Sequence, residues 1–178
     1  MTSSSIRAHV TRILRDLGID QPPIDVDVVA QALHAEIRRE PFADDLSGVL
    51  MRKDHLAVIG VNQAHLPERQ RFTIAHELGH LELHKGTPVH FDRAVVHVNL
   101  RNSISSQAVD REEIEANRFA AELLMPEAFL RRDVDELRAN GIADVMDDGL
   151  IQELARRYTV SMQAMTFRLS NLGLAGVL

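Results

Sequence analysis

The hydrophobic pattern at the start of the chain predicts two helices. Apolar residues recur at i, i+4, i+7, i+8 and i+11 over residues 6–17, and Gly18 follows them. This spacing is typical of an amphipathic helix with a C-terminal stop. Pro22-Pro23 then interrupts the chain, and either Asp25 or Asp27 can cap a second, shorter helix whose apolar side faces the core.

The next part of the chain has short apolar runs that are partly β-branched, which is typical of strands rather than helices. The runs at 47–51 and 56–61 are separated by four polar residues, and this arrangement predicts a β-hairpin. A third strand is expected near residues 37–40. We therefore expect a small sheet that follows the first two helices.

The rest of the chain has the periodicity of helices, apart from residues 87–109, where the hydrophobic pattern is weak. Pro67 suits the first turn of a helix, which we expect to run through His84 and to stop at Gly86. Within the weak stretch, residues 95–98 suggest a strand and residues 102–106 a loop. Two helices, a small sheet and then helices only are typical of an α+β fold. The later helices are expected from a cap at Asp110 to about 125, from Pro126 to about 140, and at about 148–157 and 161–171.

Composition narrows the chemistry that such a fold can carry. The 178 residues suffice for one domain, or one domain with a small appendage, without disulfides or a structural metal. The absence of cysteine excludes a thiol nucleophile, a cysteine-based zinc finger and an iron–sulfur cluster. A net charge of −6, one Tyr and no Trp disfavour direct binding to nucleic acid. With no signal-peptide segment and no run of about 18 apolar residues, we expect a soluble cytoplasmic protein with no membrane contact.

The main candidate chemistry lies at residues 76–80, where the chain has an HExxH arrangement. On a helix, residues i and i+4 lie about 40° apart around the axis, so His76 and His80 project from one face and can bind one metal ion. Glu77 points about 100° away from His76, beside the place of a metal-bound water. Zn²⁺ lowers the pKa of such a water toward about 7, and a carboxylate can then take its proton.

A catalytic zinc needs a third protein ligand and an open fourth position. His84 continues the i+4 series, but three histidines along one straight helix span about 12 Å, too far for one ion. Glu113 in a second predicted helix is a better candidate, and Asn117 on the same face can accept the outer N–H of a ligating histidine. Glu113 could instead form a capping box with Asp110. Two neighbouring acidic residues also remain open as the ligand, Glu112 and Glu115.

Two stretches of the chain resemble the ImmA/IrrE family of metallopeptidases. They are RQRFTIAHELGH at 69–80 and EIEANRFAAELLMP at 113–126, and the combination is much more specific than HExxH alone. Shorter similarities extend the resemblance over nearly the whole chain, at 22–26, 46–50, His84 and 160–161.

The resemblance implies a zincin-like peptidase domain with a gluzincin-like site. In such a site His76, His80 and Glu113 bind Zn²⁺, and Glu77 acts as the general base. It also implies a substrate class, because in this family a partner helix-turn-helix repressor is cleaved, which switches phage, mobile-element or stress regulators. We therefore expect a zinc-dependent endopeptidase whose substrate pairs as an extended peptide with the polar strand edge near 47–51.

The C-terminal part, 131–178, is expected as a helical extension of a peptidase domain at 1–130. Residues 154–169 resemble a helix-turn-helix, although Thr159 stands where Gly is usual at the turn. A net charge of +2 over residues 151–178 is small for phosphate contacts, so we favour packing or protein binding over DNA reading.

Two questions stay open at the level of sequence. A gluzincin-like site needs a hydrogen-bond donor for the oxyanion, and Tyr158 or His84 could supply it. The protein could also be a regulatory module that binds the repressor or DNA without cleaving anything. Metal analysis separates these functions, because the catalytic one requires about one zinc per chain.

Overall fold

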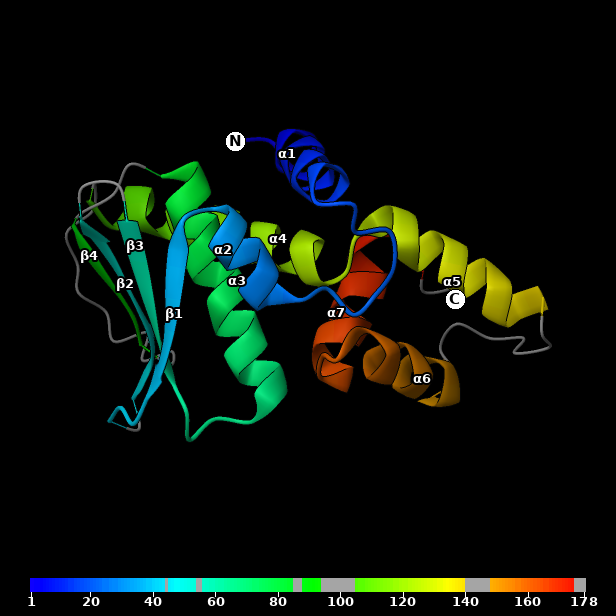
Figure 1. Ribbon diagram of the computed structural model, residues 1–178. Coiled ribbons are helices and arrows are strands. Elements are labelled where there is room, and N and C mark those ends of the chain that lie inside the picture. The colour runs from blue at the N-terminus through cyan, green and yellow to red at the C-terminus, as the bar shows by residue number, and fades with distance from the viewer. Residues whose placement is uncertain (44, 54–55, 85–87, 94–104, 140–147, 175–178) are drawn as a thin grey trace.

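The computed structural model describes residues 1–43, 45–53, 56–84, 88–93, 105–139 and 148–174 (Figure 1). It has the α+β fold that the sequence predicts, with one four-stranded sheet and helices packed on it and beside it. Among the described helices, none is long and apolar enough to cross a membrane. The elements in chain order are α1 (Ser3–Asp16), α2 (Val26–Ala32), β1 (Ala35–Glu40), β2 (Leu46–Lys53), β3 (Leu56–Asn62), α3 (Pro67–Leu83), β4 (Val89–Arg93), α4 (Ser105–Leu124), α5 (Glu127–Ala139), α6 (Asp148–Tyr158) and α7 (Met162–Asn171).

The sheet has the strand order β1-β3-β2-β4. The predicted hairpin of β2 and β3 is confirmed as an antiparallel pair, while β1 runs parallel to β3 and β4 antiparallel to β2. β2 is therefore an interior strand. The expectation that an extended peptide pairs at 47–51 is wrong, because both sides of this strand are already hydrogen-bonded within the sheet. A proline at Gly48 would consequently disturb the sheet itself and would not test docking.

β4 is a strand that the hydrophobic pattern did not predict. Its apolar residues, Val89 and Phe91, are exposed, whereas His90 pairs with the fully buried Leu50 and lies on the same inner face. The strand thus has polar residues inside and apolar residues outside, the reverse of the usual pattern. The strand expected at 95–98 lies outside the described residues.

The HExxH motif lies on α3, which packs on the inner face of the sheet and against α4 (Figure 1). Pro67 occupies its first turn and the helix ends at Leu83, one residue before the predicted end. A Cβ at Gly79 would lie 3.0 Å from the backbone of Ala116, which is tighter than ordinary van der Waals contact, so glycine favours this close approach of α3 to α4. The approach brings the acidic face of α4 against the HExxH face of α3.

α4 begins at Ser105, so the sequence prediction of its start is wrong. Asp110 lies within the helix and does not cap it, and residues 105–106 of the expected loop are helical. Residues 102–104 of that loop lie outside the described residues. The physical reason is that serine disfavours a helix by less than about 1 kcal/mol per residue, which packing of a long helix readily offsets.

The C-terminal helices α5, α6 and α7 agree with the sequence prediction to within two residues. They share the core of the rest of the protein, because the buried apolar side chains form one cluster that extends from Ile6 to Leu174. Arg168 of α7 pairs with the buried Glu122 of α4 and donates a hydrogen bond to the carbonyl of Met125 at 3.0 Å. This contact fastens the last helix to α4.

The arginines of the helix-turn-helix-like segment are all engaged within the chain. Each of the three pairs with at least one carboxylate, so this segment presents little uncompensated positive charge for phosphate contacts. The pairs are Arg156 with Glu153, Arg157 with Glu136 and Asp133, and Arg168 with Glu122.

Candidate metal centre

The two histidines of the HExxH motif lie together on one face of α3. His76 and His80 are 4% and 2% exposed, and their Nε2 atoms are 3.0 Å apart. Buried ring nitrogens at this distance need either a proton between them or a shared cation, because polar groups removed from water require a partner. The sequence predicts that these two histidines project from one face of a helix, and both rings do come from successive turns of α3.

A carboxylate from α4 joins the two histidines. The oxygens of Glu113 lie 3.3 Å from Nε2 of His76 and 3.2 Å from Nε2 of His80. Hydrogen bonds from these histidines and from His90 hold the pKa of Glu113 far below its usual range, although burial by itself would raise it. The three side chains thus form a compact His-His-Glu group at the contact between α3 and α4.

The dimensions of this group fit zinc. With zinc–ligand distances of about 2.0–2.1 Å, a tetrahedral site has ligand atoms about 3.3 Å apart. The three separations among His76, His80 and Glu113 are 3.0, 3.2 and 3.3 Å. Two imidazole nitrogens and one carboxylate are also a donor set that zinc hydrolases use, with the fourth position left for water or substrate. The described residues therefore fit a catalytic zinc.

The neighbouring acidic residues, which the sequence left open as ligands, have other surroundings. Glu115 lies 3.3 Å from Nε2 of His84 and 3.0 Å from Nε of Arg111. Glu112 groups with His80 and His84 instead, and it is exposed. Among the described residues, only the group containing Glu113 combines both histidines of the motif.

Asn117 lies one turn beyond Glu113 on α4, and its Oδ1 atom is 3.1 Å from Nδ1 of His76. A hydrogen bond from Nδ1–H to this oxygen leaves Nε2 of His76 free to bind a metal. Such a contact fixes both the tautomer and the orientation of a ligating imidazole.

Glu77 is fully buried beside the histidines. Its Oε2 atom is 3.3 Å from Nδ1 of His90, and its Oε1 atom has no hydrogen-bond partner among the described residues. A buried carboxylate oxygen without a partner is costly and calls for a water or a substrate proton. Gly48 of β2 makes room for this carboxylate, because a Cβ there would lie 3.2 Å from Oε1 and 2.4 Å from the methyl group of Thr73.

His90 is the residue of this site that the sequence reasoning left unassigned. It extends from β4, its Nδ1 and Nε2 atoms lie 3.3 Å and 3.2 Å from the carboxylates of Glu77 and Glu113, and its ring centre is 4.0 Å from that of His80. Hydrogen bonds to Glu113 and then to Glu77 raise the pKa of His90 to about 10. The signal in the sequence was weak, because His90 falls in a stretch without apolar periodicity.

The two residues expected as possible oxyanion donors have partners of their own. His84 caps α3, with its Nδ1 atom 3.3 Å from Nδ1 of His80 and its Nε2 atom facing Glu115. Tyr158 is fully buried and donates a hydrogen bond to Asp133 at 2.9 Å, and burial raises its pKa above the usual range. Within the described part of the chain, the contacts of Tyr158 do not include the His-His-Glu group.

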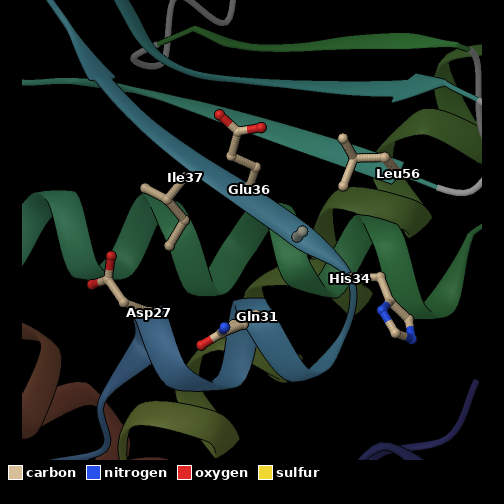
Figure 2. A pocket seen from close by; sticks show the side chains of 7 residues that line it. Asp27, Gln31, His34, Glu36, Ile37 and Leu56 are labelled. Atoms are coloured by element: carbon tan, nitrogen blue, oxygen red, sulfur yellow. The ribbon is translucent and has the colours of Figure 1, made fainter.

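One hollow on the surface of the described residues is not lined by any residue of this site. It is an open depression of about 450 Å³ between α2 and the start of β1, and Figure 2 shows the side chains that surround it. Asp27 at its rim already forms a bidentate ion pair with Arg39. The depression contains no member of the metal centre, and we assign no chemistry to it.

The fold and the site together define a zincin-like metallopeptidase domain. Residues 30–170 match the family described as the IrrE N-terminal-like domain, and the chain belongs to this metallopeptidase family. This agrees with the resemblance to ImmA/IrrE proteins drawn from the sequence motifs. It also supports the expectation of a metal at the His-His-Glu group.

Two similar proteins and one solved structure illustrate the relationship. The chain is 30% identical over 129 residues to an uncharacterized immunity region protein of Bacillus phage phi105, covering 68% of this chain and 69% of the phage protein. It is 33% identical over 113 residues to the radiation response metalloprotease IrrE of Deinococcus radiodurans, covering 64% of this chain and 30% of IrrE. A Mycobacterium tuberculosis transcriptional regulator has a similar fold, with a TM-score of 0.61 and 18% identity over 94% of this chain and 46% of the regulator.

Proposed function

We propose that this protein is a zinc-dependent endopeptidase that cleaves a partner transcriptional repressor of the helix-turn-helix type. The observation that carries the proposal is the buried group of His76, His80 and Glu113 with the carboxylate of Glu77 beside it. Two histidines and one carboxylate are a ligand set that zinc hydrolases use, and a second carboxylate that is not a ligand can serve as the base.

In the proposed mechanism, His76, His80 and Glu113 hold the zinc, and Asn117 keeps His76 in the orientation needed for binding. When bound, zinc supplies a Lewis acid that polarises the peptide carbonyl and acidifies water. Glu77 takes a proton from the attacking water and then delivers it to the nitrogen of the departing amine. Its burial and its Oε1 atom suit this role, because that oxygen has no hydrogen-bond partner among the described residues, whereas Oε2 lies 3.3 Å from Nδ1 of His90.

The proposed substrate class rests on the relatives. One is named as a phage immunity region protein and another as a radiation response metalloprotease, which suggests proteolysis linked to a regulatory switch. An extended segment of the repressor would pair with β4, because this strand is at the edge of the sheet and carries His90 into the site. Pairing of a peptide with an edge strand supplies main-chain hydrogen bonds and leaves alternate side chains for specificity.

The test is co-expression with the repressor that is encoded beside the protein, with wild type compared to Glu77→Gln. We expect the repressor to be shortened on a gel with the wild type and to stay intact with Glu77→Gln. Metal analysis should find about one zinc per chain in both proteins, because Glu77 is not a ligand in this proposal. An intact repressor that co-purifies with the wild type would instead favour a binding module without proteolysis.

A further inference from the structure

His90 is the only described residue outside α3 and α4 whose side chain is hydrogen-bonded to both Glu77 and Glu113. We propose that His90 is a positioning residue that holds these two carboxylates in their working orientations, one as the general base and the other as the metal ligand. This inference deepens the proposed peptidase function and rests on it for the role of Glu77.

The geometry explains why a histidine suits this position. An ionised carboxylate can only accept hydrogen bonds, so each ring nitrogen of His90 occupies the place of a donor. The two nitrogens flank the carbon Cε1 of one rigid ring and point in different directions, so the ring sets the spacing between the carboxylates of Glu77 and Glu113. The ring itself is held in place, because it packs against His80 and its strand pairs with β2 through Leu50.

The two carboxylates need such support for different reasons. Glu77 is buried, and the hydrogen bond to His90 is the one that the described residues provide for it. Without this bond the carboxylate could rotate away from the water. Glu113 shares its Oε1 atom between His80 and His90, so loss of His90 would leave the metal ligand less restrained. Substitution of a residue that orients a metal ligand in this way typically lowers metal affinity or activity by about 10- to 100-fold.

Three substitutions separate the two contacts. In His90→Gln the amide nitrogen can take the place of Nε2 and keep the contact with Glu113, while the contact with Glu77 is lost. In His90→Asn the amide nitrogen can take the place of Nδ1 and keep the contact with Glu77 alone. In His90→Phe an aromatic ring remains at this position, but it carries no hydrogen-bond donor. Met51→Gln is a matched control, because Met51 lies on a neighbouring strand with its side chain exposed on the outer face.

The experiment measures zinc affinity by competition with a chromophoric chelator, and cleavage of the co-encoded repressor as kcat and KM. We expect His90→Asn and His90→Phe to bind zinc about 10- to 100-fold more weakly than wild type, and His90→Gln to bind it nearly normally. At saturating zinc, His90→Gln and His90→Phe should show kcat lowered by a similar factor with little change in KM. His90→Asn should then recover most of its kcat.

The outcomes distinguish this inference from the proposed function. Equal zinc affinity in the wild type and all three variants would overturn the contact with Glu113, and equal kcat would overturn the contact with Glu77. Equal losses in all three variants would mean that neither amide replaces a ring nitrogen, and wild-type behaviour of His90→Phe alone would mean that His90 merely fills space; either result contradicts the inference. If the wild type cleaves no repressor, the proposed function fails, while the zinc measurements still decide whether His90 supports Glu113.

Discussion

The close contact between β2 and α3 at Gly48 allows a sharp test of how the sheet shapes the site. A Cβ at this position would lie 2.4 Å from Cγ2 of Thr73, although carbon atoms normally approach to about 3.5 Å. Gly48→Ala therefore forces a shift of about 1 Å, and overpacking of this kind costs about 1–3 kcal/mol. Replacing glycine also stiffens the unfolded chain, which offsets about 0.4–1 kcal/mol of this cost.

The expected net effect is a free energy of unfolding lowered by about 1–2 kcal/mol. For a chain of this size, each kcal/mol lowers Tm by about 2–4 °C, so thermal unfolding should shift down by about 2–8 °C. The same Cβ lies 3.2 Å from Oε1 of Glu77, and a displaced general base should lower cleavage about tenfold. Both quantities can be measured on one preparation, by thermal unfolding and by the repressor gel assay.

Two further variants separate the effect on the fold from the effect on the site. In Gly48→Ala/Thr73→Ser the clashing methyl group is gone, so most of the stability should return while cleavage stays low. Gly60→Ala is the matched control on the outer face of the same sheet, where a Cβ meets only the end of the Phe42 ring at 2.9 Å. It should leave cleavage unchanged. A wild-type Tm and wild-type cleavage in Gly48→Ala would refute the reasoning.

The remaining predictions concern the ligands and the C-terminal helices. Glu113→Ala should reduce bound zinc well below one per chain, whereas Glu112→Ala and Glu115→Ala should retain it; loss of zinc in either of the latter would reassign the ligand. Asn117→Ala should weaken zinc binding about 10- to 100-fold in the chelator assay, because His76 loses its orienting contact. Removing zinc with a chelator should lower the Tm of the wild type but not that of Glu113→Ala, since only a protein that binds the metal gains stability from it. Tyr158→Phe should lower the free energy of unfolding by about 1–3 kcal/mol, because the buried carboxylate of Asp133 loses one hydrogen bond while its contacts with Arg132 and Arg157 remain; a loss of cleavage without this destabilisation would make Tyr158 an oxyanion donor again.

A part of the site could be predicted from the sequence when its residues lie close together in the chain. His76 and His80 lie on successive turns of one helix and Glu77 is next to His76, so the arrangement of these three residues follows from the helical repeat alone. The choice of Glu113 over Glu112 and Glu115 is different, because it depends on how α4 packs against α3. That packing is set by Gly79 and Ala116, which no periodicity of the sequence reveals.

β4 shows why the role of His90 could not be predicted from the sequence. Hydrophobic patterns identify strands through the side chains that they bury, but β4 directs His90 and Asp92 toward the site and exposes Phe91. A strand that lines a polar site therefore loses the signal by which strands are recognised. Without β4, the hairpin partner β2 looks like an edge, and this explains the mistaken docking position at residues 47–51. The segment that the pattern described least well is thus the one that brings His90, the proposed positioning residue, to the candidate metal centre.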